Sequence, residues 1–125
     1  MEKKEIPFIP YGRQWIGEDD IQTVVETLRS PCIARGPKVE EFERALCDMI
    51  GAPYAVAVSS GTAGLHIACL AAGVEPGDEV ITSPNTFVAS ANCVAYCGAK
   101  PIFADIDQRT YNIDPKEIEK KITER

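Results

Sequence analysis

Charge is scarce in the middle of this sequence, and the signatures of several protein classes are missing. Residues 51–100 contain one basic and three acidic residues, although the 125-residue chain carries 13 basic and 19 acidic ones. The net charge of −6 leaves no basic stripe to neutralise nucleic-acid phosphates. No apolar run reaches the roughly 18 residues of a membrane helix, and no apolar signal segment follows residues 1–5. We therefore expect a cytoplasmic protein that binds neither nucleic acid nor a membrane.

Signatures of metal sites and disulfides are equally sparse. The five cysteines include no C-x-x-C pair and accompany no secretory signal, which favours reduced thiols. Cys93 and Cys97 lie one helical turn apart and could hold a soft metal, but two buried apolar thiols explain the spacing better. His66 stands near Cys69, yet it is the one histidine in the chain, so a packed side chain is favoured over a nucleophile and base. We predict no metal site.

The uncharged middle indicates alternating strands and helices. Short apolar segments recur along it, and a stretch of helical length that ends at a glycine follows each of the first two. The predicted strands are residues 55–58, 79–82 and 100–104, and the predicted helices are residues 62–72, before Gly73, and 86–97, before Gly98. Pro84 excludes a central strand there, and Asn85 is a good N-cap. So few charges predict an α/β fold: a parallel βαβαβ unit, covered on both faces, with right-handed crossovers.

Two amphipathic helices precede this unit. Apolar residues at helical spacing are Ile21, Val24, Val25 and Leu28 in the first and Val39, Phe42, Leu46 and Met49 in the second. Pro31 ends the first helix, and Gly51 ends the second. Residues 1–17 form an extended arm, whose Tyr11 and Trp15 could contact another subunit or the body of the same chain.

The C-terminal part contains a further turn and helix. Asp105 and Asp107 alternate at a predicted strand end, where two carboxylates could bind Mg²⁺ or cap the following turn, and we expect capping. A last helix begins with Asp114 as N-cap, Pro115 at the first helical position and Glu117 at the capping-box position.

A candidate anion site follows the first predicted strand. Residues 59–64, with the sequence Ser-Ser-Gly-Thr-Ala-Gly, open a helix, where N–H groups and the positive end of the helix dipole gather. Gly61 lets the backbone approach an anion, and the hydroxyls of Ser60 and Thr62 supply further donors. The spacing matches neither the dinucleotide fingerprint nor the P-loop, so a plain turn with an N-cap is the alternative. We interpret the segment as a phosphate-binding cup.

A second candidate lies at the next strand end. Phe87 begins the helix there, and adjacent loops of a parallel sheet lie side by side at one edge. Its ring could therefore pack against a planar ligand held by the cup. The alternative is that Phe87 belongs to the core, as most phenylalanines do.

Several motifs occur in an order that is similar to that of a known family. They are residues 9–12, 35–43, 59–66, 74–81, 84–92, 101–107 and 112–115. Together they resemble the DegT/DnrJ/EryC1/StrS aminotransferases, and the opening resembles the branch that makes 4-amino-4,6-dideoxy sugars, such as the transaminase of the pseudaminic acid pathway. The resemblance implies a homodimeric fold-type-I enzyme that uses pyridoxal 5'-phosphate. Its reaction would convert a nucleotide-linked keto sugar to an amino sugar, typically with glutamate as donor, for surface polysaccharide or glycan biosynthesis.

The resemblance also implies roles for single residues. Gly61 and Thr62 would hold the cofactor phosphate, with Ser60 adjacent. Phe87 would stack on the pyridine ring. These are the same residues that the local sequence pattern had singled out.

The resemblance further implies a substrate loop and a domain assignment. Residues 32–37 match a segment near the sugar-nucleotide site, which makes Ile33 and Arg35 candidate substrate-binding residues. Residues 18–125 correspond to part of the large, cofactor-binding domain, truncated at its C-terminal end.

The catalytic residues of this family lie downstream of the matched segments. They include the lysine that binds the cofactor covalently, and no lysine of this chain matches it, so no catalytic residue is predicted within the chain. We expect the 125 residues to be the N-terminal portion of a longer enzyme and inactive alone. One alternative is a non-catalytic phosphate- or nucleotide-binding module, or a half-enzyme that needs a partner chain. A lesser alternative is a sugar dehydratase of the same family that uses pyridoxal phosphate.

Overall fold

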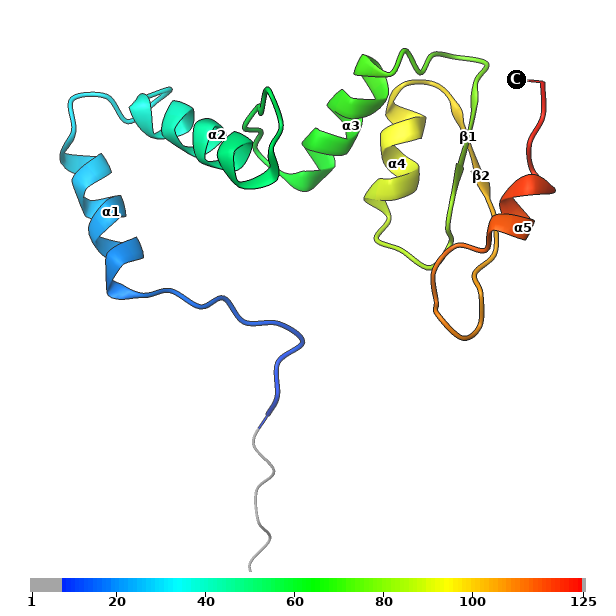
Figure 1. The fold of residues 1–125 in the computed structure, drawn as a ribbon, viewed down its shortest axis with the longest axis horizontal. Helices are drawn as coiled ribbons and strands as arrows, with labels where there is room; N and C mark the ends of the chain where they lie inside the picture. The colour runs from blue at the N-terminus through cyan, green and yellow to red at the C-terminus, as the bar shows by residue number, and fades with distance from the viewer. Residues whose placement is uncertain (1–7, 125) are drawn as a thin grey trace, which may run out of the picture. The chain divides into compact units, whose positions relative to one another are not determined.

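The computed structural model describes residues 8–124, and their contacts divide the chain into two compact units (Figure 1). Of the described residues, 8–57 belong to the first unit and 58–124 to the second. The first contains helices α1 (Glu18–Arg29) and α2 (Pro37–Ile50). The second contains α3 (Gly61–Ala71), β1 (Glu79–Thr82), α4 (Ala89–Tyr96), β2 (Lys100–Phe103) and α5 (Pro115–Glu119). The domain limits expected from the sequence stay a prediction.

Both helices of the first unit form where the sequence predicts them. At the start of α1 the Gly17 N–H donates to the Asp20 carboxylate at 2.8 Å, and acidic residues fill the first turn, where they complement the helix dipole. Pro37 occupies the first turn of α2, and Gly51 ends that helix with φ of 69°, a left-handed conformation that glycine adopts at little cost. Neither helix contains a buried residue.

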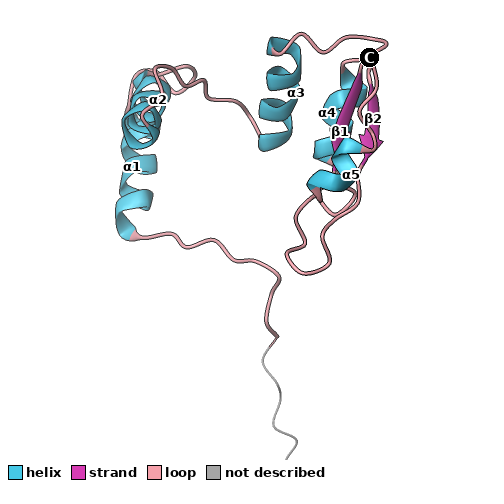
Figure 2. Cartoon of the chain, turned by 45° about the vertical axis from the view of Figure 1, so that its right-hand side comes forward, coloured by secondary structure: helices cyan, strands magenta, loops and turns pink. Residues whose placement is uncertain are grey.

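The second unit is built on two short parallel strands. β1 and β2 pair in register from Glu79 opposite Lys100 to Thr82 opposite Phe103, and α4 connects them. α3 packs against α4, as both views show (Figures 1 and 2). The parallel pairing confirms the predicted α/β class. Handedness of the crossovers stays a prediction.

The buried core is small and lies entirely in the second unit. Its members are Ala89, Cys93, Val94, Cys97, Ala99 and Ala104. Val94 of α4 is the largest fully buried side chain, at 1% exposure, and Cys69, Val74 and Val80 pack around its cluster. Gly98 lies in the tight turn between α4 and β2. It has φ of 75°, and a Cβ there would come within 2.9 Å of Pro76 Cγ, so only glycine fits without strain.

The predicted strand at residues 55–58 is wrong. These residues belong to no strand in the structure. A strand exists only through its ladder of hydrogen bonds, and the described sheet contains only β1 and β2. The Ala57 N–H donates instead to the Glu43 carboxylate at 2.8 Å.

The helix predicted at residues 86–97 begins three residues later than expected, at Ala89. Asn85 is therefore not its N-cap. The preceding loop has its own hydrogen bonds, because the Asn85 N–H donates to Ser83 Oγ at 3.2 Å and the hydroxyls of Thr86 and Ser90 pair at 3.0 Å. By contrast, the last helix, α5, begins as predicted, with the Asp114 carboxylate accepting the Lys116 N–H at 2.8 Å.

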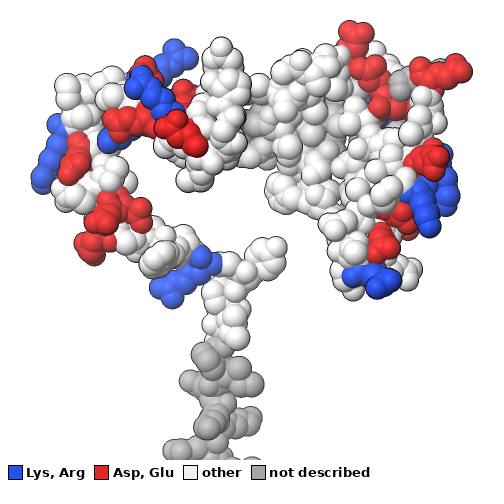
Figure 3. Space-filling model, viewed as in Figure 1, with Lys and Arg blue, Asp and Glu red and all other residues white. Residues whose placement is uncertain are grey.

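The expectation that the uncharged middle is covered on both faces is also wrong. Val56 is 76% exposed, and Leu70 of α3 is 54% exposed. The surface that α3 contributes carries none of the charges coloured in Figure 3, and the apolar side chains of Leu65, Ile67 and Leu70 are exposed on it. Two strands of four residues each are too small to cover such helices on every side. Among residues 8–124, no helix is long and apolar enough to cross a membrane.

Candidate active site

The N-terminus of α3 has the features of an anion site. Ser60 is the N-cap, in an extended conformation, and its hydroxyl accepts the Ala63 N–H at 3.2 Å. The N–H groups of Gly61 and Thr62 lie in the first turn, where a helix provides no acceptor of its own. Since the first turn contains no acidic residue, no carboxylate of that turn opposes an incoming anion. The Ser60 oxygen is used in capping, but its proton is still available to a ligand.

Gly61 leaves the approach to these donors open. A Cβ built at this position would meet no atom within 4 Å, and the residue is exposed. Glycine here is not required by the backbone, whose φ lies outside the left-handed region. The residue therefore keeps space free above the first-turn N–H groups.

Phe87 lies outside the core. Its side chain is 73% exposed, which contradicts the alternative that it is a core residue. It belongs to the loop between β1 and α4, next to the hydrogen-bonded hydroxyls of Thr86 and Ser90. An exposed ring on a loop held by hydrogen bonds is available to pack against a planar ligand.

The fold brings the two candidate regions to one edge. β1 and β2 end there, and α3 and α4 both begin there (Figure 1). At this edge a parallel α/β unit gathers helix N-termini, and such units bind their ligands there. Ser60, Gly61 and Thr62 lie together at the start of α3, and Phe87 lies on the neighbouring loop.

The candidate substrate residues Ile33 and Arg35 belong to the first unit. Ile33 lines an apolar groove of about 660 Å³ between α1 and α2, together with Val24, Leu28 and Phe42. Arg35 does not line this groove, and its φ of 52° makes it one of two non-glycine residues with a left-handed backbone among those described.

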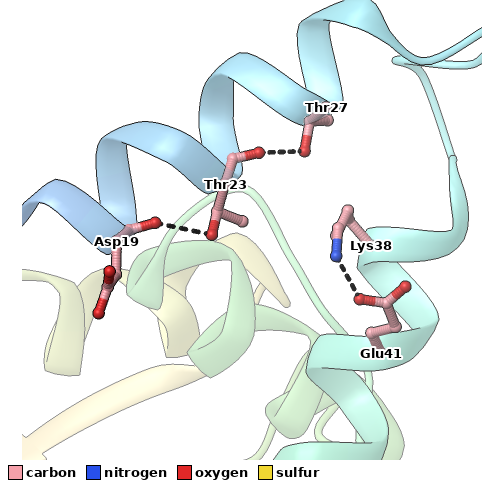
Figure 4. Close-up of polar contacts among 5 residues, drawn as sticks. All are labelled: Asp19, Thr23, Thr27, Lys38 and Glu41. Carbon is pink, nitrogen blue, oxygen red and sulfur yellow. Dashed lines mark hydrogen bonds and ion pairs between the residues drawn. The ribbon is translucent and has the colours of Figure 1, made fainter.

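The polar side chains of this groove are already engaged (Figure 4). The hydroxyls of Thr23 and Thr27 donate to backbone carbonyls one turn earlier in α1, each at 2.8 Å. Lys38 and Glu41 of α2 form an ion pair at 2.6 Å, and this carboxylate raises the pKa of the lysine above its ordinary value. The groove therefore presents mainly apolar surface, without a free cation for a phosphate.

Three thiols and the histidine of the second unit have structural roles. Cys93 and Cys97 are buried as expected, and their thiols donate to backbone carbonyls of α4. Burial and the nearby Cys93 thiol raise the pKa of Cys69, which makes a reactive thiolate unfavourable. His66 packs edge-on against Tyr96 at a centroid distance of 5.3 Å. No group of three or more metal-ligating side chains occurs among residues 8–124.

Asp107 caps a turn, as expected. Its carboxylate accepts the N–H groups of Thr110 and Arg109, each at 2.9 Å, and these bonds lower its pKa. Sequence reasoning did not single out Tyr111 as a candidate site residue, although its φ is 60°. No local motif marks this position, because its backbone follows from the turn that Asp107 organises.

A parallel β–α–β unit with an open helix N-terminus and an exposed aromatic ring at the same edge belongs to the α/β class, whose members commonly bind phosphate-bearing ligands at this edge. The chain belongs to the DegT/DnrJ/EryC1/StrS aminotransferase family, whose profile matches residues 14–125. Its fold is that of the corresponding part of solved aminotransferases that bind pyridoxal phosphate.

Three relatives illustrate the similarity. The spore coat polysaccharide biosynthesis protein SpsC of Bacillus subtilis is 50% identical over 100% of this chain. Spr1654 of Streptococcus pneumoniae, assigned as a sugar aminotransferase and solved in its PLP-form, superposes with a TM-score of 0.87 at 39% identity over 92% of the chain. An aminotransferase from Psychrobacter cryohalolentis superposes with a TM-score of 0.83 at 34% identity over 94% of it.

This chain spans about a third of the length of these relatives. It covers 32% of SpsC, 29% of Spr1654 and 30% of the Psychrobacter enzyme. The activity, substrates and partners of a whole enzyme are therefore matters for proposal.

Proposed function

We propose that this chain provides the phosphate-binding part of a sugar aminotransferase that uses pyridoxal 5'-phosphate in polysaccharide or glycan biosynthesis. The observation that carries the proposal is the start of α3, with two first-turn N–H groups and free space over Gly61, in a chain of this family. The family relatives named for sugar amination and for spore coat polysaccharide biosynthesis support the substrate class.

The residues present fit the phosphate of this cofactor. The N–H groups of Gly61 and Thr62, the Thr62 hydroxyl and the Ser60 proton would donate to its oxygens, and the dipole of α3 would favour its charge. Phe87 would pack on the pyridine ring and orient it. When bound, pyridoxal phosphate supplies the carbonyl group and electron-withdrawing ring through which an amino group passes between substrates.

The remaining assignments belong to the same proposal. The substrate is a nucleotide-linked keto sugar and the amino donor is an amino acid such as glutamate. Ile33 and Arg35 contribute to the substrate site, and the working enzyme is a cytoplasmic homodimer. The 125 residues alone bind the cofactor without turnover, because the residues that do the covalent chemistry in this family lie beyond the segments that this chain matches.

The phosphate cup can be tested by adding a methyl group at Gly61, beside the N–H groups of Gly61 and Thr62. Gly61→Ala should leave folding intact, since the added Cβ meets no atom, but it should weaken binding of pyridoxamine phosphate by about tenfold or more, through loss of charge-assisted hydrogen bonds. Equilibrium dialysis measures the affinity. Pyridoxamine phosphate is chosen because its amine does not react with surface lysines.

Gly12→Ala is the matched control, because a Cβ at Gly12 also meets no atom and its backbone is not left-handed. Pyridoxamine without its phosphate should bind much more weakly than the phosphate ester. Equal affinity of the wild type and the Gly61→Ala variant would refute the cup. Competition by inorganic phosphate as strong as by pyridoxamine phosphate would favour a general phosphate-binding module.

A further inference from the structure

A second cavity lies at the edge where β1 ends, separate from the residues assigned to the cofactor. Its volume is about 380 Å³, within the range of small-molecule sites. The end of β1, the following loop and the turn after β2 line it. The polar lining residues are Thr82, Ser83, Asn85, Thr86, Tyr111 and Asn112.

The lining is polar but uncharged. Of the described residues around the cavity, none is a lysine, arginine, aspartate or glutamate. The side-chain amides of Asn85 and Asn112 form no hydrogen bond with other described residues, so both can donate to and accept from a ligand. Tyr111 adds an aromatic surface that is 68% exposed. Such a lining suits a neutral ring with several hydroxyl groups better than a phosphate.

The turn that carries Tyr111 and Asn112 is built before any ligand arrives. The Tyr111 N–H donates to the Asp107 carbonyl at 2.8 Å, and the Asp107 N–H donates to the Asn112 carbonyl at 2.9 Å. Ile106 and Ile113 pair beside it in an antiparallel bridge. The left-handed backbone at Tyr111 is thus fixed by several bonds, which is how strained residues persist at binding sites. These bonds use backbone groups of Tyr111 and Asn112, so the side chains of both residues can contact a ligand.

We propose that this cavity binds the sugar ring of the substrate through the amides of Asn85 and Asn112 and the ring of Tyr111. The inference rests on the proposed function, because it assigns the substrate of the same edge of the fold. The cavity shares the loop of Asn85 and Thr86 with Phe87, so a sugar held here lies beside the loop that carries the cofactor-packing ring.

The test uses the 125-residue chain and three probes: methyl α-D-glucopyranoside, UDP-glucose and UDP. Amide NMR shifts are followed for residues 82, 83, 85, 86 and 111–113 during each titration. The glucoside and UDP-glucose should move these signals, whereas UDP alone should not. In Asn112→Ala the dissociation constant of the glucoside should rise about fivefold, since one hydrogen-bonding amide is lost. The turn survives that change because it uses the Asn112 backbone.

Gln108→Ala is the matched control, because it removes an exposed amide from the same turn but outside the cavity. Its affinity for the glucoside should equal that of the wild type. Absence of shifts with both sugars, shifts with UDP alone, or an unchanged affinity in Asn112→Ala would overturn the proposal. Binding of pyridoxamine phosphate should be the same in wild type and Asn112→Ala, so failure of the sugar site is distinguishable from failure of the phosphate cup.

Discussion

Among single residues, Asp107 shows how one carboxylate fixes a turn. Its two backbone N–H donors favour the ionised form, so its pKa lies below the ordinary value of 3.8. The Asp107 carboxylate therefore binds a proton more readily in the unfolded chain than in the folded one. The resulting contribution to stability is fully present above pH 3.8 and is lost as the pH falls through the lower, folded pKa.

We therefore expect the amide signals of Arg109 and Thr110 to titrate with a midpoint below 3.8. A pH series of NMR spectra measures this midpoint. In Asp107→Asn the same signals should lose this titration, because the amide side chain does not ionise. A wild-type midpoint at or above the ordinary carboxyl value would show that the turn does not favour the charged form.

The candidate site residues could be predicted to different extents. Ser60 and Gly61 stand in a helix-opening pattern that is visible locally, and the structure places them at the start of α3 as expected. Phe87 was expected at the start of a helix after a strand, but it lies on the loop before α4. Its exposure could not be inferred from composition, which favours burial of phenylalanine. No sequence motif marked Tyr111, since its conformation depends on a turn in which its N–H donates to the Asp107 carbonyl.

Among the elements, α4 contributes most to packing. It carries three of the six buried residues and connects the two strands. Val94 is at the centre of its buried cluster. The stability of the second unit should therefore respond most strongly to changes on this face of α4.

Val94→Ala should reduce the free energy of unfolding by about 2 kcal/mol, from lost burial and an added cavity. Urea unfolding followed by circular dichroism measures the change. Val88→Ala is a matched control because Val88 is 59% exposed, and it should cost less than about 0.5 kcal/mol. Equal effects of the two substitutions would show that the core is not organised around Val94.

Helices were better predicted than strands. The apolar stripes of α1 and α2 lie within each segment, and the stop signals of α1, α2 and α3 lie just after it, so their limits follow from local sequence. Residues 55–58 have the composition of a strand, but a strand also needs a neighbour. The start of α4 was misplaced because side-chain hydrogen bonds of Ser83 and Thr86 stabilise a longer loop.

In the whole molecule, packing is unevenly distributed between the two units. Every buried hydrophobic residue of the described chain lies between residues 89 and 104. Among residues 8–57, none is buried. Local opening should therefore cost much less in the first unit than in the second.

Hydrogen exchange followed by mass spectrometry tests this difference. Amides of α1 and α2 should exchange fast, and those of α4, β1 and β2 should exchange slowly. Val94→Ala should accelerate exchange in the second unit alone. Equal protection of both units in the wild type would contradict the expected division.

The sequence by itself determined the family, the limits of α1, α2 and α3 to within a residue or two, and the Ser60 cap at the start of α3, because motifs, caps and glycines act over a few neighbouring residues. It also determined the parallel α/β class, through the recurrence of apolar segments and helices. The tertiary structure alone decided which segments pair as strands and which apolar side chains are covered. It also decided how the β1 loop and the Asp107 turn meet around the polar cavity. These features depend on contacts between residues distant in the chain, and local patterns carry no record of such contacts.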